Sequence, residues 1–176
     1  MELSKAKEEI DMTKVQDLEK LRNSFKPDKV TYLFVGESIP SNGTFFYTAD
    51  SPLYKYTKEA FEEVFQGVEF TLKLFMDKGF YLFDLTESVA GMGYKEKINA
   101  VASGIPKLAH FIEAEKPEYV LSVKNTNLSA IIMSNAEVGD LISEDHIFDL
   151  PAPIFGSHHY YKDKLVEALK IIYGIA

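Results

Sequence analysis

The residues best suited to chemistry lie between Gly36 and Tyr47, directly after an apolar run that ends at Val35. Glycine lets a backbone approach a ligand closely, and Glu37 places a carboxylate at the end of a buried segment. Three consecutive aromatic residues, Phe45 to Tyr47, follow in a stretch typical of a loop. We expect two of these rings to cover the core and one to face a ligand. Glu37 is either a site residue or a solvated carboxylate.

Two further groups could share that site. Asp84 follows a second apolar run, Phe80–Phe83, where its carboxylate could either contact a ligand or cap the next segment through backbone amides. His158 and His159 stand just before the last amphipathic segment. An imidazole can donate a hydrogen bond at neutral pH, so one of them could reach the same site, although adjacent histidines also serve as loop and N-cap residues.

Helical and strand-like patterns alternate along the chain, and these elements must position the candidate residues. Continuous apolar runs predict strands at Val30–Val35, Phe80–Phe83, Tyr119–Val123 and His146–Leu150. Helical spacing predicts helices before Lys26, over Tyr54–Met76 with a break at Gly67, over Ile105–Ile112, around Asn127–Ser134 and over Tyr160–Tyr173. The alternation predicts an α/β fold, a three-layer α/β/α domain over residues 1–176 with a central four-stranded parallel sheet. Residues 1–26 form a helical segment packed on it.

Doubly wound sheets bind ligands in the crevice beyond the carboxyl ends of their strands. The segments that follow the four predicted strands should therefore surround one site. They are Gly36–Tyr47, Asp84–Gly93, Lys124–Asn127 and Pro151–His159.

Composition restricts the function classes. The 176 residues include no cysteine, which removes disulfides and thiolate chemistry and fits a reducing, cytoplasmic location. A net charge of −8 argues against a broad basic surface for duplex DNA, although lysines could form a local basic rim. Phosphate-binding and dinucleotide-binding glycine motifs are absent, as is a nucleophile elbow. We expect no metal, no cofactor and no membrane-spanning segment.

Three short motifs resemble the uracil-DNA glycosylase superfamily. They are Val35-Gly36-Glu37-Ser38-Ile39-Pro40, Gly43-Thr44-Phe45-Phe46-Tyr47 and Gly79-Phe80-Tyr81-Leu82-Phe83-Asp84-Leu85-Thr86. Superfamily members have a Gly-Gln-Asp-Pro or Gly-Glu-Ala-Pro loop after the first strand and an aromatic ring that stacks on the base. An Asn after the second strand reads the base, and a His-Pro-Ser loop precedes the last helix. The resemblance spans Val30 to about Leu165, in the same order.

The resemblance implies a role for each matching residue. Glu37 would orient a water and stabilise positive charge on the sugar, and Phe46 would stack on a flipped base. The implied substrate-binding residues are Gly36, Ser38, Pro40, Phe46, Tyr47 and Asp84. The chain departs from the family pattern at Asp84, which replaces the base-reading Asn, and at Leu150, which replaces the His. His158 or His159 would then support the departing base.

Two functions remain open from the sequence. One is a DNA glycosylase of base-excision repair, a hydrolase that removes a damaged or deaminated base. The other is a catalytically inactive module of the same fold that binds a free nucleobase, a nucleoside or nucleic acid. The expected partner is DNA, single-stranded or damaged duplex, or a free nucleobase; a purely structural role is a third possibility.

Overall fold

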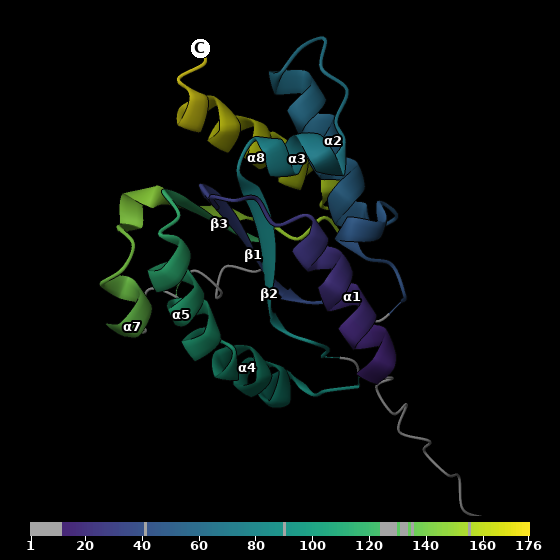
Figure 1. Ribbon diagram of the computed structural model, residues 1–176, viewed down its shortest axis with the longest axis vertical. Coiled ribbons are helices and arrows are strands. Elements are labelled where there is room, and N and C mark those ends of the chain that lie inside the picture. Colours follow the sequence, from purple (N-terminus) through teal and green to yellow (C-terminus); the bar gives the residue numbers. More distant parts are fainter. Residues whose placement is uncertain are drawn as a thin grey trace, which may run out of the picture.

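Four parallel strands form the centre of the molecule. The computed structural model describes residues 12–40, 42–89, 91–123, 130, 134, 136–154 and 156–176. The strands are β1 (Tyr32–Ser38), β2 (Phe80–Thr86), β3 (Tyr119–Val123) and β4 (Ile147–Leu150), in the sheet order β2-β1-β3-β4 (Figure 1). All neighbouring pairs run parallel. The predicted four-stranded parallel sheet is confirmed.

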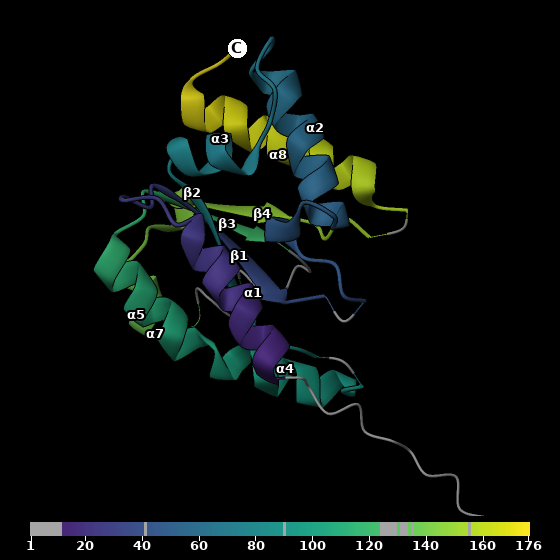
Figure 2. The same cartoon turned by 45° about the vertical axis from the view of Figure 1, so that its right-hand side comes forward.

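Helices cover both faces of the sheet, which gives the three-layer α/β/α arrangement expected from the sequence. Figure 2 shows α2, α3 and α8 above the sheet and α4, α5 and α7 below it, with α1 in front of the β2 side. The helices are α1 (Met12–Ser24), α2 (Pro52–Val64), α3 (Leu72–Asp77), α4 (Tyr94–Ser103), α5 (Ile105–Glu115), α7 (Ala136–Gly139) and α8 (His158–Tyr173). Single turns of 3₁₀ helix occur at Phe46–Thr48 and Glu144–His146.

The core explains why the strand segments are apolar throughout. Leu33, Val35 and Leu121 are fully buried at the centre of the sheet, because helices exclude water from both of its faces. Above it, Phe61 packs edge-on against Phe80 with ring centroids 5.0 Å apart. Burial of each such side chain contributes about 1.5–3 kcal/mol, so the sheet is a rigid support for the loops at its ends.

Two predicted strands end too early. β1 continues through Gly36 to Ser38, and β2 continues through Asp84 to Thr86, because Gly36 pairs with Asp84 and Ser38 with Thr86 across the sheet. The polar residues predicted to begin loops are therefore the last residues of strands. Their backbones are held by ladder hydrogen bonds, which fix the directions of their side chains.

Differences among the helices are local. The region predicted as one broken helix over 54–76 contains α2 and α3, and α4 was not predicted. Gly93 is the N-cap of α4, and its backbone N–H donates to Glu96 Oε2 at 2.9 Å, which stabilises the first turn of the helix. The charged, glycine-containing sequence of this region is typical of a loop, so it does not predict the helix. Most of the predicted helix around Asn127–Ser134 lies outside the described residues. Within the described residues, no helix has the length and apolar character needed to cross a bilayer.

Candidate functional site

A cavity of about 580 Å³ lies at the carboxyl ends of the strands. Its wall is formed by the ends of β1, β2 and β3, by the loop after β4, and by the starts of α2 and α4. The described residues that line it are Gly36–Pro40, Asn42, Thr44–Phe46, Ser51–Leu53, Leu82, Asp84, Val89, Gly91, Lys97, Val123 and Ala152–Ile154. Its position matches the crevice expected from the sequence, beyond the carboxyl ends of parallel strands. The predicted crevice segment Lys124–Asn127 lies outside the described residues.

Most of the predicted site residues line this cavity. From the β1 end come Gly36, Glu37, Ser38 and Pro40, and Phe46 and Asp84 join them from the next loop and from β2. Glu37 and Asp84 are therefore residues of one cavity wall, although they are 47 positions apart in the sequence. Parallel pairing of β1 with β2 brings them together.

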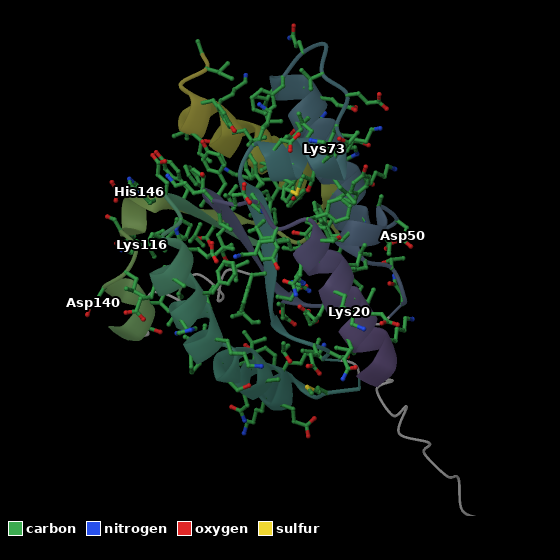
Figure 3. The ribbon with its side chains drawn as sticks, viewed as in Figure 1. Lys20, Asp50, Lys73, Lys116, Asp140 and His146 are labelled. Carbon is green, nitrogen blue, oxygen red and sulfur yellow. The ribbon has the colours of Figure 1, made fainter. Side chains whose placement is uncertain are left out.

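Phe46 is held firmly at the cavity wall. Its ring packs against Phe75 at 5.0 Å, Tyr54 at 5.8 Å and Tyr47 at 5.2 Å between centroids. Asp50 closes the turn around it, because its Oδ1 accepts hydrogen bonds from the backbone N–H of Phe45 at 2.9 Å and from Thr48 Oγ1 at 2.6 Å. Figure 3 shows Asp50 at the outer surface, beside the start of α2. The ring is thus in place before any ligand arrives.

Asp84 is bound to Arg22, a residue of α1 that sequence reasoning did not select. Arg22 Nη2 lies 2.7 Å from Asp84 Oδ2 and 3.3 Å from Glu19 Oε1, and Nη1 donates to the Leu82 carbonyl at 3.1 Å. The Arg22 side chain is only 3% exposed and that of Asp84 is 9% exposed. Burial opposes the guanidinium charge, but Asp84 and Glu19 outweigh it and raise the pKa of Arg22.

Gly36 makes room for this carboxylate. A Cβ atom built on Gly36 would overlap Asp84 Oδ1, and Gly36 pairs directly with Asp84 in the sheet. Any larger residue at position 36 would push the carboxylate away from Arg22. The glycine is thus required by close packing at the cavity floor.

Tyr47 does not line the cavity. Its ring is buried, and its hydroxyl accepts a hydrogen bond from the backbone N–H of Leu82 at 2.8 Å. Burial raises the pKa of Tyr47 above its ordinary value, so the hydroxyl stays neutral. Since β2 is an edge strand, Tyr47 and Arg22 together satisfy the outward backbone groups of Leu82. All three rings of the predicted aromatic run are buried, one more than expected.

His158 and His159 are not among the residues that line the cavity either. The His158 ring stacks on Tyr56 of α2, with centroids 4.8 Å apart and planes 20° apart, and it contacts His159 at 4.1 Å. This packing joins the start of α8 to α2. Leu150, which the sequence resemblance aligned with a histidine, is a core residue that is 1% exposed and pairs with Val123.

Sequence reasoning overlooked Arg22 and Lys97. Arg22 lies four residues after Leu18 and three before Phe25, both of which pack on the core, so its position on the buried stripe of α1 was a usable signal. Lys97 lies on α4, a helix that the sequence did not predict, and it is one of the lysines that could form the local basic rim. It is the one basic residue among the described residues of the cavity wall.

The cavity is therefore acidic and apolar, with a single lysine at its wall. Within the described ranges, no group of three or more histidine, aspartate and glutamate side chains could hold a metal ion. α2 begins at the wall with Ser51 as its N-cap, whose side chain accepts from the Tyr54 N–H at 3.1 Å. The cavity can thus offer carboxylate acceptors, an aromatic ring and the positive end of a helix.

Neither a comparison with models of known protein families nor a search of curated protein sequences finds a match for this chain.

Proposed function

We propose that this chain is a DNA glycosylase related to the uracil-DNA glycosylase superfamily, which hydrolyses the N-glycosidic bond of a damaged or deaminated base. The observation that supports the proposal is the meeting of Glu37, Phe46 and Asp84 in one cavity at the carboxyl ends of a parallel sheet. Its volume of about 580 Å³ falls within the range of pockets for small ligands. Such a volume is suitable for one nucleobase with part of its sugar.

Phe46 would receive the base. A base inside a duplex must leave the stack before an enzyme reaches its glycosidic bond, and an aromatic face replaces part of the lost stacking. Base–aromatic contacts contribute about 1–3 kcal/mol each. Since the Phe46 ring is only 2% exposed, its contact with the base would lie at the low end of this range. Because Tyr54 and Phe75 already hold the Phe46 ring, binding would cost it little conformational entropy.

Glu37 would supply the charge that cleavage requires. As the bond between sugar C1′ and the base nitrogen breaks, its electron pair leaves with the base and positive charge develops on the sugar. A carboxylate on the cavity wall stabilises that charge and orients a water molecule. The water oxygen then bonds to C1′, one water proton passes to the carboxylate, and the base takes a proton from solvent.

Lys97 and the start of α2 would stabilise the departing base. Both are at the cavity wall, and both offer positive charge, the lysine as an ammonium group and the helix through its N-terminal N–H groups. They would replace the missing histidine in this role. Negative charge on the leaving base is thus opposed by groups other than imidazole.

The test is base release from oligonucleotides that each carry one altered base: uracil, hypoxanthine, xanthine, an oxidised pyrimidine or 8-oxoguanine. Abasic sites are converted to strand breaks by alkali and counted for the wild type, Glu37→Gln and the control Glu69→Gln, which alters an exposed carboxylate that does not line the cavity. We expect release of at least one base, reduced about 100-fold or more by Glu37→Gln and unchanged by Glu69→Gln. Full activity in Glu37→Gln, or no release by the folded wild type, would reject the proposal.

A binding module without catalysis is the second candidate. It is favoured by the positions of His158 and His159 outside the cavity wall and by the apolar Leu150 in the core. Such a module would bind a free base or nucleoside saturably. Retention on single-stranded DNA that falls steeply with salt would instead favour a nucleic-acid substrate.

A further inference from the structure

Asp84 presents a fixed carboxylate to the cavity. Its Oδ2 is held at 2.7 Å by Arg22, while its Oδ1 lies directly over Gly36, another residue of the cavity wall. The side chain belongs to a strand that is paired on both sides of this position, at Val35 with Phe83 and at Ser38 with Thr86. The acceptor is therefore rigid, and a ligand must adapt to it.

Arg22 forms a buried ion pair with that carboxylate. The guanidinium is almost completely buried, and Asp84 is its nearest counter-charge, with Glu19 farther away at 3.3 Å. A ligand that weakened this pair would leave a buried cation short of its closest partner, which is strongly unfavourable. An ionised carboxylate only accepts hydrogen bonds. The Asp84 carboxylate at the cavity floor therefore favours ligands that donate hydrogen bonds.

Nucleobases differ in what their edges donate. Uracil places one N–H between two carbonyl oxygens, and a carboxylate that accepts from this N–H repels both oxygens. Guanine and related bases place a ring N–H beside an exocyclic amino group. Those adjacent donors suit a carboxylate whose Oδ2 already accepts from Arg22 better than a single N–H flanked by two oxygens does, because neither donor is beside a group that the carboxylate repels on that side. Each charge-assisted hydrogen bond is stronger than a neutral one.

We infer that the cavity selects a base whose edge carries an amino group beside a ring N–H, in preference to uracil, and that Asp84 is the residue that reads this edge. The inference rests on the proposed function, because it takes the ligand to be a nucleobase. Glu37 adds a second negative charge to the same cavity, which further favours donor-rich ligands. Arg22 acts as a positioning residue through Asp84.

The test is calorimetric binding of three nucleosides to the full chain. Guanosine and inosine differ only by the 2-amino group, and uridine presents the edge with a single N–H. We expect guanosine to bind about 10- to 100-fold more tightly than inosine, and uridine to bind most weakly. Asp84→Asn replaces one carboxylate oxygen by an amide donor, so the guanosine-to-inosine ratio should fall to about 1–3.

Asp84→Asn leaves Arg22 without its nearest counter-charge, which could by itself disturb the cavity. The double variant Arg22→Gln/Asp84→Asn removes both charges together and is therefore measured as well. Its ratio should also fall to about 1–3 if Asp84 reads the amino group. Equal affinity for guanosine and inosine in the wild type, tighter uridine binding, or an unchanged ratio in both variants would overturn the inference and leave a nucleobase cavity in place. Binding of no nucleoside, together with no base release, would overturn the proposed function itself.

Discussion

Removing either partner of the Arg22–Asp84 ion pair should destabilise the protein as much as removing both. Asp84→Asn leaves a buried guanidinium without its nearest counter-charge, and Arg22→Met leaves a nearly buried carboxylate facing an apolar side chain. Arg22→Met/Asp84→Asn removes the charges together, so neither desolvation cost remains uncompensated. The three variants form a double-mutant cycle.

The magnitude follows from burial. With exposed fractions of 3% for Arg22 and 9% for Asp84, the cost of each single substitution is about 3 kcal/mol, at the lower end for breaking a buried pair. The double variant leaves no unpaired charge, but the buried Leu82 carbonyl loses its donor, which costs about 1–3 kcal/mol. We therefore expect no more than about 3 kcal/mol for the double variant and a coupling energy, the sum of the two single costs less the double cost, of at least about 3 kcal/mol.

Urea unfolding followed by far-ultraviolet circular dichroism measures all four corners of the cycle. The matched control is the same cycle for Lys73 and Asp77, which are paired on α3 but 73% and 49% exposed, and for which we expect about 0.3–0.5 kcal/mol. A coupling energy for Arg22 and Asp84 no larger than that of the control pair would refute the reasoning. The ion pair would then contribute no more than a surface pair does.

Three further outcomes are expected. Gly104→Ala should lower the free energy of unfolding by about 3 kcal/mol, because a Cβ atom there would overlap the β2 backbone. The control Gly93→Ala, whose Cβ would make only ordinary contacts, should lower it by about 1 kcal/mol or less. Equal losses for the two variants in urea unfolding would contradict this reasoning. Burial raises the pKa of Tyr81 to about 12, so its contribution to stability is complete below about pH 10 and lost between about pH 10 and 12. Unfolding free energies that stay level across that window would count against it. Tyr47→Phe should lower the free energy of unfolding by about 1–3 kcal/mol, because the Leu82 N–H loses its acceptor. Nucleoside affinity should stay within about twofold of the wild type, and a larger fall would show that Tyr47 contributes to the ligand site.

The pattern of apolar residues along the sequence was sufficient to predict the buried strands. The strand Tyr119–Val123 was predicted with its observed bounds, because an apolar run after Pro117 has no other stable environment in a small domain. Alternation of strands and helices then requires parallel pairing, since each connection crosses over through a helix. That geometry places the carboxyl ends of the first two strands, and with them Glu37 and Asp84, at the same edge of the sheet.

Contacts between distant segments decided the rest. No local signal extends β1 and β2 through polar residues; each is strand because the other supplies its ladder partners. Arg22 meets Asp84 across 62 positions of sequence, and only the packing of α1 on the β2 edge brings them together. His158 likewise lies against Tyr56 rather than at the cavity wall, because the packing of α8 on α2 sets its direction. The sequence thus determined which residues stand at the strand ends, whereas tertiary packing determined where their side chains point and which partners hold them.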